Sequence, residues 1–247
     1  MADRVHRGLR VFNKVFTEQA EVLYQHALIL HGIADDLSTF HHRAKVGSIT
    51  GGTTMAVGGA AAIAGLALAP LTFGASLVVS AVGLGVVTAG GITSASAAIS
   101  DRVHDLQDRK KIEVVAGDYL TRLNEVARCL GYVREGMGRL ARHPLLRRNN
   151  YYASSDWDVR RALQMVSLVR EPADRAADVA ERGTATLSGL FKHMDHYFVD
   201  KGGKQELRKT CKKEATAQVH SVATILQEGL QELNTIREQM LDAYGNI

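Results

Sequence analysis

The sequence has little of what builds disulfide-rich, zinc-binding or β-sheet proteins. It contains only two cysteines, Cys129 and Cys211, with no CxxC spacing between them. This argues against a disulfide framework or a cysteine-rich zinc site and suits a reducing, cytosol-facing environment. Three prolines and 6% aromatic residues in a chain of 247 residues favour helices over strands. The composition therefore predicts an all-α protein.

A strong excess of one charge is also missing. The formal net charge is +4 and the pI is about 9.1, which suits an anionic membrane surface but lacks the basic density of a dedicated nucleic-acid binder. A secretory signal is not indicated, because the first 30 residues carry charges throughout, among them Arg4, Arg7 and Arg10. We expect no nucleic-acid partner, no signal peptide and cytosolic termini.

The most informative absence is that of charge in residues 46–100. These 55 residues contain no Asp, Glu, Lys, Arg or His, and they hold 11 of the 23 glycines. Pro70 and Gly74, near the middle, favour a turn between two helical limbs, 46–69 and 75–100. At ~1.5 Å per residue each limb is long enough to cross a hydrocarbon core of ~30 Å. The segment predicts a central hydrophobic, Gly/Ala-rich helical hairpin that inserts into a membrane.

Small residues recur along both limbs, and in lipid such residues let two helices pack closely. The residues expected to form this membrane hairpin are Gly65, Pro70, Gly74, Leu77, Val82, Gly83, Gly85 and Gly91. The alternative is a hairpin buried within a soluble helical bundle, because both limbs are weakly apolar by transmembrane standards.

Amphipathic helices are predicted on both sides of the hairpin, from apolar residues that recur every three or four positions. The regions are an N-terminal helix (1–45), the hairpin (46–100), a helical region with a basic loop (101–203) and a C-terminal heptad helix (204–247). The heptad positions are Val219, Val222, Leu226, Leu233, Ile236 and Met240. Such a seam pairs with another helix, either in the chain's own bundle, in a helical partner or in a second copy of the chain.

The region 101–203 is expected to contain several helices whose ends are marked by proline, glycine or capping residues. The first ends at His143 and Pro144, and a basic loop follows. Later elements are a helix capped by Ser155 that runs to 169, a helix that Pro172 opens and Gly183 ends, and an apolar stripe over 187–198.

No group of residues with catalytic spacing stands out. Residues 47–54 have the GxxxxG spacing of a phosphate-binding loop, but Thr53 replaces its lysine. His193 and His196 could share one helix face, but two ligands do not make a zinc site. We expect no enzyme activity, no cofactor and no metal.

The segment from Gly65 to Gly91, GLALAPLTFGASLVVSAVGLGVVTAGG, resembles the hydrophobic core segment of the apolipoprotein L family. The matching positions are Leu66, Pro70, Thr72, Gly74, Ser76, Leu77, Ser80, Gly83, Gly85, Ala89 and Gly91. The resemblance implies lipid binding, membrane association and, for some members, ion-conducting insertion. It also implies roles at endothelial junctions and in vascular permeability. One branch of the family has a second apolar stretch, whereas residues 163–198 here are interrupted by charges such as Arg170 and Asp174.

Together these features predict a non-enzymatic, lipid-binding protein on the plasma membrane, at junctions or on intracellular vesicles. The alternative is a membrane-anchored scaffold whose heptad helix recruits a helical partner. His31, His41, His42 and His104 flank the uncharged segment, so we expect acid to favour binding to anionic lipids, because these side chains gain charge below about pH 6.5.

Overall fold

The computed structural model describes residues 2–43, 107–148, 156–202 and 204–245. The elements there are helices α1 (Ala2–Arg43), α5 (Asp108–Ala141), α6 (Pro144–Arg148), α7 (Trp157–Tyr197) and α8 (Lys212–Gly245) and strands β1 (Phe198–Lys201) and β2 (Lys204–Leu207). The all-α prediction is confirmed. The predicted membrane hairpin, with each residue assigned to it, lies outside the described residues.

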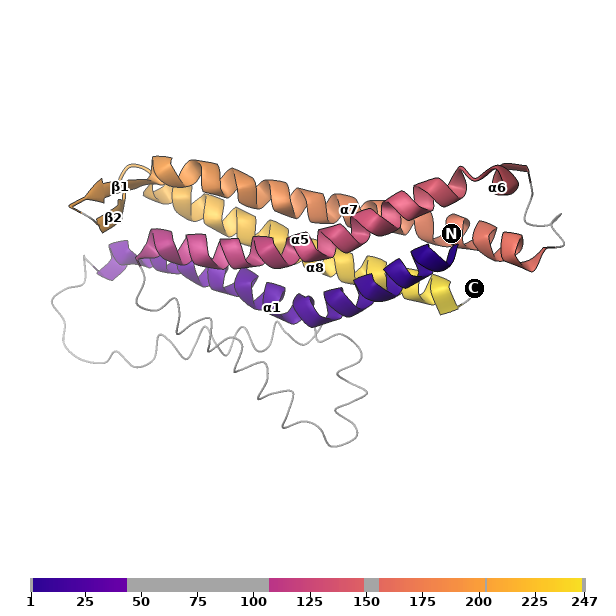
Figure 1. Cartoon of the computed structure of the whole chain (residues 1–247). Coiled ribbons are helices and arrows are strands. Elements are labelled where there is room, and N and C mark those ends of the chain that lie inside the picture. Colours follow the sequence, from indigo (N-terminus) through magenta and orange to yellow (C-terminus); the bar gives the residue numbers. More distant parts are fainter. Residues whose placement is uncertain (1, 44–106, 149–155, 203, 246–247) are drawn as a thin grey trace, which may run out of the picture.

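The four long helices, α1, α5, α7 and α8, form an antiparallel bundle (Figure 1). α1 packs against α5 and α8, and α7 packs against the same two helices, so the four helices form a closed ring. Successive long helices run in opposite directions, which is the up-down-up-down order of a four-helix bundle. The start of α1 and the end of α8 lie at one end of the bundle, and β1 and β2 lie at the other.

Apolar side chains at helical spacing fill the centre of the bundle. Phe12, Phe16 and Leu23 of the stripe predicted in α1 are buried, with at most 1% of their surface exposed. Tyr119 of α5 is equally buried, and its hydroxyl donates a hydrogen bond of 3.2 Å to the carbonyl of Leu226 in α8. Burial of one large apolar side chain contributes about 1.5–3 kcal/mol, so these stripes hold the helices together.

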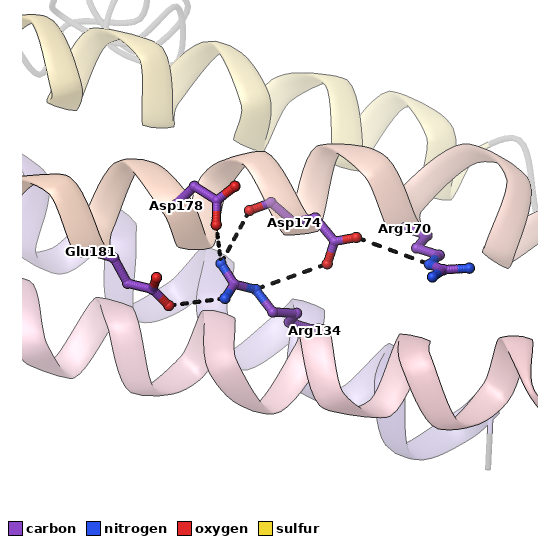
Figure 2. A network of polar contacts seen from close by, with 5 residues as sticks. All are labelled: Arg134, Arg170, Asp174, Asp178 and Glu181. Atoms are coloured by element: carbon purple, nitrogen blue, oxygen red, sulfur yellow. Dashed lines mark hydrogen bonds and ion pairs between the residues drawn. The ribbon is translucent and has the colours of Figure 1, made fainter.

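Polar contacts join α5 to α7 along their exposed edge (Figure 2). The guanidinium of Arg134 lies 2.6 Å from a carboxylate oxygen of Asp178 and 2.9 Å from one of Glu181. Its Nε atom lies 3.9 Å from Asp174, which also approaches Arg170 at 4.0 Å. Because the three acidic residues recur at helical spacing on α7, one arginine reaches all of them.

α7 is one continuous helix where the sequence predicted shorter elements. Its N-cap is Asp156, whose carboxylate accepts hydrogen bonds from two backbone amides of the first turn. The predicted cap, Ser155, lies outside the described residues. Pro172 sits inside the helix rather than opening it. An interior proline costs about 3 kcal/mol, but Val169 and Ala173 on either side are fully buried, and their packing favours a helix that continues.

Gly183 does not end a helix either. It lies within α7, and a Cβ atom at this position would come within 2.8 Å of Cδ2 of Leu123 on α5. The glycine therefore allows α5 and α7 to approach closely, which the sequence pattern did not distinguish from a helix stop.

The strands and the helix α6 were not predicted. β1 and β2 pair antiparallel, with Phe198 opposite Leu207 and Lys201 opposite Lys204. Gly202 in the turn has a φ of 64°, in the left-handed region that glycine adopts most readily. Because these residues form a hairpin, the C-terminal helix begins at Lys212 rather than near Lys204.

Candidate functional site

One end of the bundle, here called the β-hairpin end, gathers most of the features that bear on function. It consists of the last turns of α1 and α7, the first turns of α5 and α8, and strands β1 and β2 (Figure 1). α1 ends at Arg43 and α5 begins at Asp108. The chain on both sides of the uncharged segment therefore lies at this same end.

Three lysines at or just before the start of α8 line part of a cavity at the β-hairpin end. The cavity has a volume of about 420 Å³, and its lining includes Lys209, Lys212 and Lys213 together with Ser38 of α1. The hydroxyl of Thr216, another lining residue, is buried and makes no hydrogen bond within the described part of the protein. Lysines, hydroxyls and the N-terminal end of a helix all favour an anion.

Hydrogen bonds and ion pairs connect the β-hairpin to the start of α5. Arg109 donates hydrogen bonds to Asp195 at 2.7 Å and to the side-chain oxygen of Gln205 at 3.1 Å. Its Nε donates to Glu113 at 2.7 Å, and this contact does most to raise the pKa of Arg109 above its ordinary value. The backbone amide of Gln205 donates to the side chain of Gln107 at 2.8 Å. These bonds fix the β-hairpin beside the first residues after the uncharged segment.

Two histidines lie in the interface between α1 and α8, in the half of the bundle towards the β-hairpin end. His31 contacts His220, and His220 contacts Asp35 at 2.9 Å. Burial, followed by the nearby His220, lowers the pKa of His31. His26, five residues before His31 in the same helix, is fully buried, and its burial lowers its pKa as well. Burial in the bundle therefore favours the neutral imidazoles of His26 and His31.

The six heptad positions, Val219, Val222, Leu226, Leu233, Ile236 and Met240, are all buried, each with 4% or less of its surface exposed. They face the chain's own helices, which is the intramolecular arrangement that the sequence left open beside pairing with a partner. A partner helix could use this seam only if the bundle opened, so recruitment through it stays a prediction.

His193 and His196 both lie against the ring of Tyr197, but in the part of the chain that the structure describes only His196 belongs to a group of potential metal ligands. His193 lies beside Gly189, Tyr197 and Gln218, whereas His196 lies beside Cys211 and Glu214. Sequence reasoning missed the second group because Cys211 is distant from His196 along the chain. The CxxE spacing of Cys211 and Glu214, just before and within the first turn of α8, is the signal that could have pointed to them. Among the described helices, none has an apolar stretch long enough to cross a membrane.

These features define the class of protein: an all-α protein built on an antiparallel four-helix bundle, with a long uncharged segment inserted between its first two long helices. The family model for apolipoprotein L matches residues 1–147, more than half of the chain. The chain therefore belongs to the apolipoprotein L family, as the resemblance of residues 65–91 indicated.

Three relatives illustrate the extent of the similarity. Apolipoprotein L domain-containing protein 1 of Rattus norvegicus is 33% identical over 132 residues, 53% of this chain and 54% of that protein. Its Homo sapiens counterpart is 33% identical over 125 residues, 51% of this chain and 45% of that protein. Apolipoprotein L3 of Homo sapiens is 23% identical over 253 residues, 93% of this chain and 61% of that protein. The chain spans about half the length of the first two relatives, and no solved structure matches it.

Proposed function

We propose that this protein is a non-enzymatic, lipid-binding apolipoprotein L protein that attaches to anionic membranes through residues 46–100, with the β-hairpin end of the bundle towards the lipid. The observation that carries the proposal is the position of Arg43 and Asp108 at one end of the bundle. A segment that leaves and re-enters at one end can enter a membrane as a hairpin while the bundle remains folded beside it. Its lack of charge makes lipid a favourable environment.

The lysines at the same end support the choice of anionic lipid. Lys209, Lys212 and Lys213 line one cavity with Ser38 and Thr216, and lysine near an anionic surface contributes about 1 kcal/mol. A phosphate-bearing headgroup could accept hydrogen bonds from the lysines and from the buried hydroxyl of Thr216. The cavity therefore suits a headgroup while the uncharged segment occupies the hydrocarbon.

The scaffold alternative, with the heptad helix recruiting a partner, has less support because the six seam positions are occupied within the chain. A role at endothelial junctions or in vascular permeability stays a prediction of the family resemblance, as does location on the plasma membrane or vesicles.

Vesicle flotation of the full chain tests the proposal. We expect the protein to float with vesicles that contain phosphatidylserine and to bind phosphatidylcholine vesicles more weakly, with binding to the anionic vesicles reduced by salt. A variant that lacks residues 46–100 should remain in the dense fraction. If that variant floats as well as the wild type, the uncharged segment is not the anchor.

A charge-matched pair of triple variants tests the orientation. Replacing Lys209, Lys212 and Lys213 with Gln should lower the affinity for anionic vesicles by up to about a hundredfold, because each lysine near an anionic surface contributes ~1 kcal/mol. Replacing Arg4, Arg7 and Arg10 with Gln removes the same charge at the opposite end of the bundle. This replacement should have a much smaller effect on the affinity for anionic vesicles. Equal losses would contradict an orientation with the β-hairpin end towards the lipid.

A further inference from the structure

We propose that His196, Cys211 and Glu214 form a Zn²⁺ site that joins the end of α7 to the start of α8. His196 lies in the last turn of α7, Cys211 directly precedes α8, and Glu214 lies in its first turn. The potential ligand atoms of the three side chains lie within 4.8 Å of one another. The sequence predicted no metal here, because folding brings His196 to the other two residues.

The separation of His196 and Cys211 matches the geometry that Zn²⁺ requires. Nε2 of His196 lies 3.6 Å from Sγ of Cys211. With Zn–S of about 2.3 Å, Zn–N of about 2.0–2.1 Å and a tetrahedral angle, the two ligand atoms of one zinc ion are separated by about 3.6 Å. The histidine and the cysteine are therefore already placed as two ligands of one ion, and Glu214, which has a carboxylate oxygen within 4.8 Å of both ligand atoms, offers a third.

The chemistry of the three ligands selects among metals. A thiolate and an imidazole favour Zn²⁺ over Mg²⁺ and Ca²⁺, which prefer oxygen ligands. On binding, the Cys211 thiol loses its proton to solvent, and a water molecule fills the fourth position of the tetrahedron. Cys211 and Glu214 would both be anionic ligands at the N-terminal end of α8, where the helix dipole favours negative charge.

Neighbouring side chains can orient these ligands. The Thr210 hydroxyl lies 3.8 Å from the Cys211 sulfur, and the Tyr197 hydroxyl lies 3.5 Å from a carboxylate oxygen of Glu214. The sulfur belongs to a side chain with 8% of its surface exposed, whereas His196 and Glu214 are exposed. One side of the site is thus formed by protein, and solvent reaches the other, so an ion can enter without opening the bundle.

Zn²⁺ at this site would act as a cross-link. The ion would close the β1–β2 hairpin at its base, because His196 precedes the hairpin and Cys211 follows it. The site lies at the β-hairpin end, and its formation does not depend on membrane binding. The two proposals can therefore fail separately.

Cobalt substitution tests the site directly. The metal-stripped full chain, without an affinity tag and kept reduced, is titrated with Co²⁺ in the absence of vesicles. We expect one equivalent to produce the visible bands of tetrahedral Co²⁺ and a near-ultraviolet sulfur-to-cobalt charge-transfer band, and Zn²⁺ to abolish both. The absence of these bands in the wild type would overturn the proposal.

Matched variants identify the ligands. Cys211→Ala should abolish the charge-transfer band, and His196→Gln should weaken binding by more than the roughly tenfold to hundredfold loss expected for an outer-shell partner. Cys129→Ala removes the other free cysteine, and His193→Gln removes the neighbouring imidazole; both should bind like the wild type. A charge-transfer band that persists in Cys211→Ala, or that disappears in Cys129→Ala, would exclude the site.

Discussion

The Nδ1 atoms of His31 and His220 lie 3.0 Å apart across the interface between α1 and α8. Asp35 accepts a hydrogen bond from Nε2 of His220 at 2.9 Å, which places the proton of neutral His220 on that nitrogen. Nδ1 of His220 is then an acceptor, and Nδ1–H of His31 is the donor. If both imidazoles are charged, two N–H groups face each other and the hydrogen bond is lost.

Acid should destabilise the bundle through His31 and His26. The pKa of His31 and that of His26 are lowered in the folded protein, chiefly by burial. As the pH falls through 6.5, the unfolded chain therefore takes up protons first, and the free energy of unfolding decreases until the folded-state pKa values are passed. Thermal unfolding followed by circular dichroism should give a melting temperature that falls between about pH 7.5 and 5.5.

His31→Gln should make this decrease smaller, because glutamine has no proton to gain. His193→Gln, on the exposed face of α7, is the control. A melting temperature independent of pH over this range would contradict the role of the buried imidazoles. The effect differs from attraction to anionic headgroups, the role that the sequence suggested for His31, and the side chains of His41, His42 and His104 lie outside the described residues.

Arg134 should contribute more to stability than an ordinary surface arginine. Arg134→Met keeps the apolar stem but removes the contacts to Asp174, Asp178 and Glu181. We expect the free energy of unfolding in urea to fall by about 1–2 kcal/mol, between the values for exposed pairs and for charge-assisted hydrogen bonds. Arg139→Met removes one exposed pair with Glu135 and should cost about 0.3–0.5 kcal/mol. Equal losses in the free energy of unfolding for the two variants would show that the contacts of Arg134 with three acidic residues add nothing to stability beyond a single exposed pair.

The close approach of α5 and α7 can be tested by replacing each of two glycines of α7 with leucine and comparing the stability of the two variants. Gly183→Leu would overlap Leu123 and should destabilise the protein by about 1–3 kcal/mol. Gly189→Leu, in the same helix, meets no atom within 4 Å at its Cβ position and should stabilise the protein by up to about 1 kcal/mol. Urea unfolding of the two variants compares them directly. A stabilised Gly183→Leu variant would contradict the close packing.

The anchor and the bundle should respond to different charge substitutions. Val82→Arg places a charge in the uncharged segment, at a cost of about 2.5–3.5 kcal/mol in a membrane, and should abolish flotation without lowering the melting temperature. Val222→Arg places a charge at a position with 4% of its surface exposed in the core and should lower the melting temperature. Loss of flotation and of folding in both variants would indicate a single cooperative unit.

Tags at residues 1 and 247 test the topology. α1 begins and α8 ends at the same end of the bundle, away from the β-hairpin end (Figure 1), and a hairpin crosses a membrane an even number of times. Both tags should therefore lie on one side of the membrane, and on the cytosolic side that the sequence predicts they should be protected from external protease in intact cells. Digestion of one tag alone would establish a single crossing.

The stripes of α1, α5 and α8 could be predicted because their apolar residues repeat at helical spacing and one bundle buries them. The continuity of α7 could not. Pro172 and Gly183 are local signals of a break, and only the packing of Val169, Ala173 and Leu123 around them outweighs those signals. The group formed by His196 and Cys211 was equally inaccessible, because a two-stranded hairpin with no strong strand pattern brings its members together.

The insertion of residues 44–107 between α1 and α5 also sets the order in which the protein can assemble. During synthesis the uncharged segment leaves the ribosome before α5, α7 and α8 exist, when α1 has no other long helix to pack against. The segment can therefore meet a chaperone or a bilayer before the bundle closes. Because the entropy of loop closure grows only slowly with loop length, α1 can still join the other three helices afterwards.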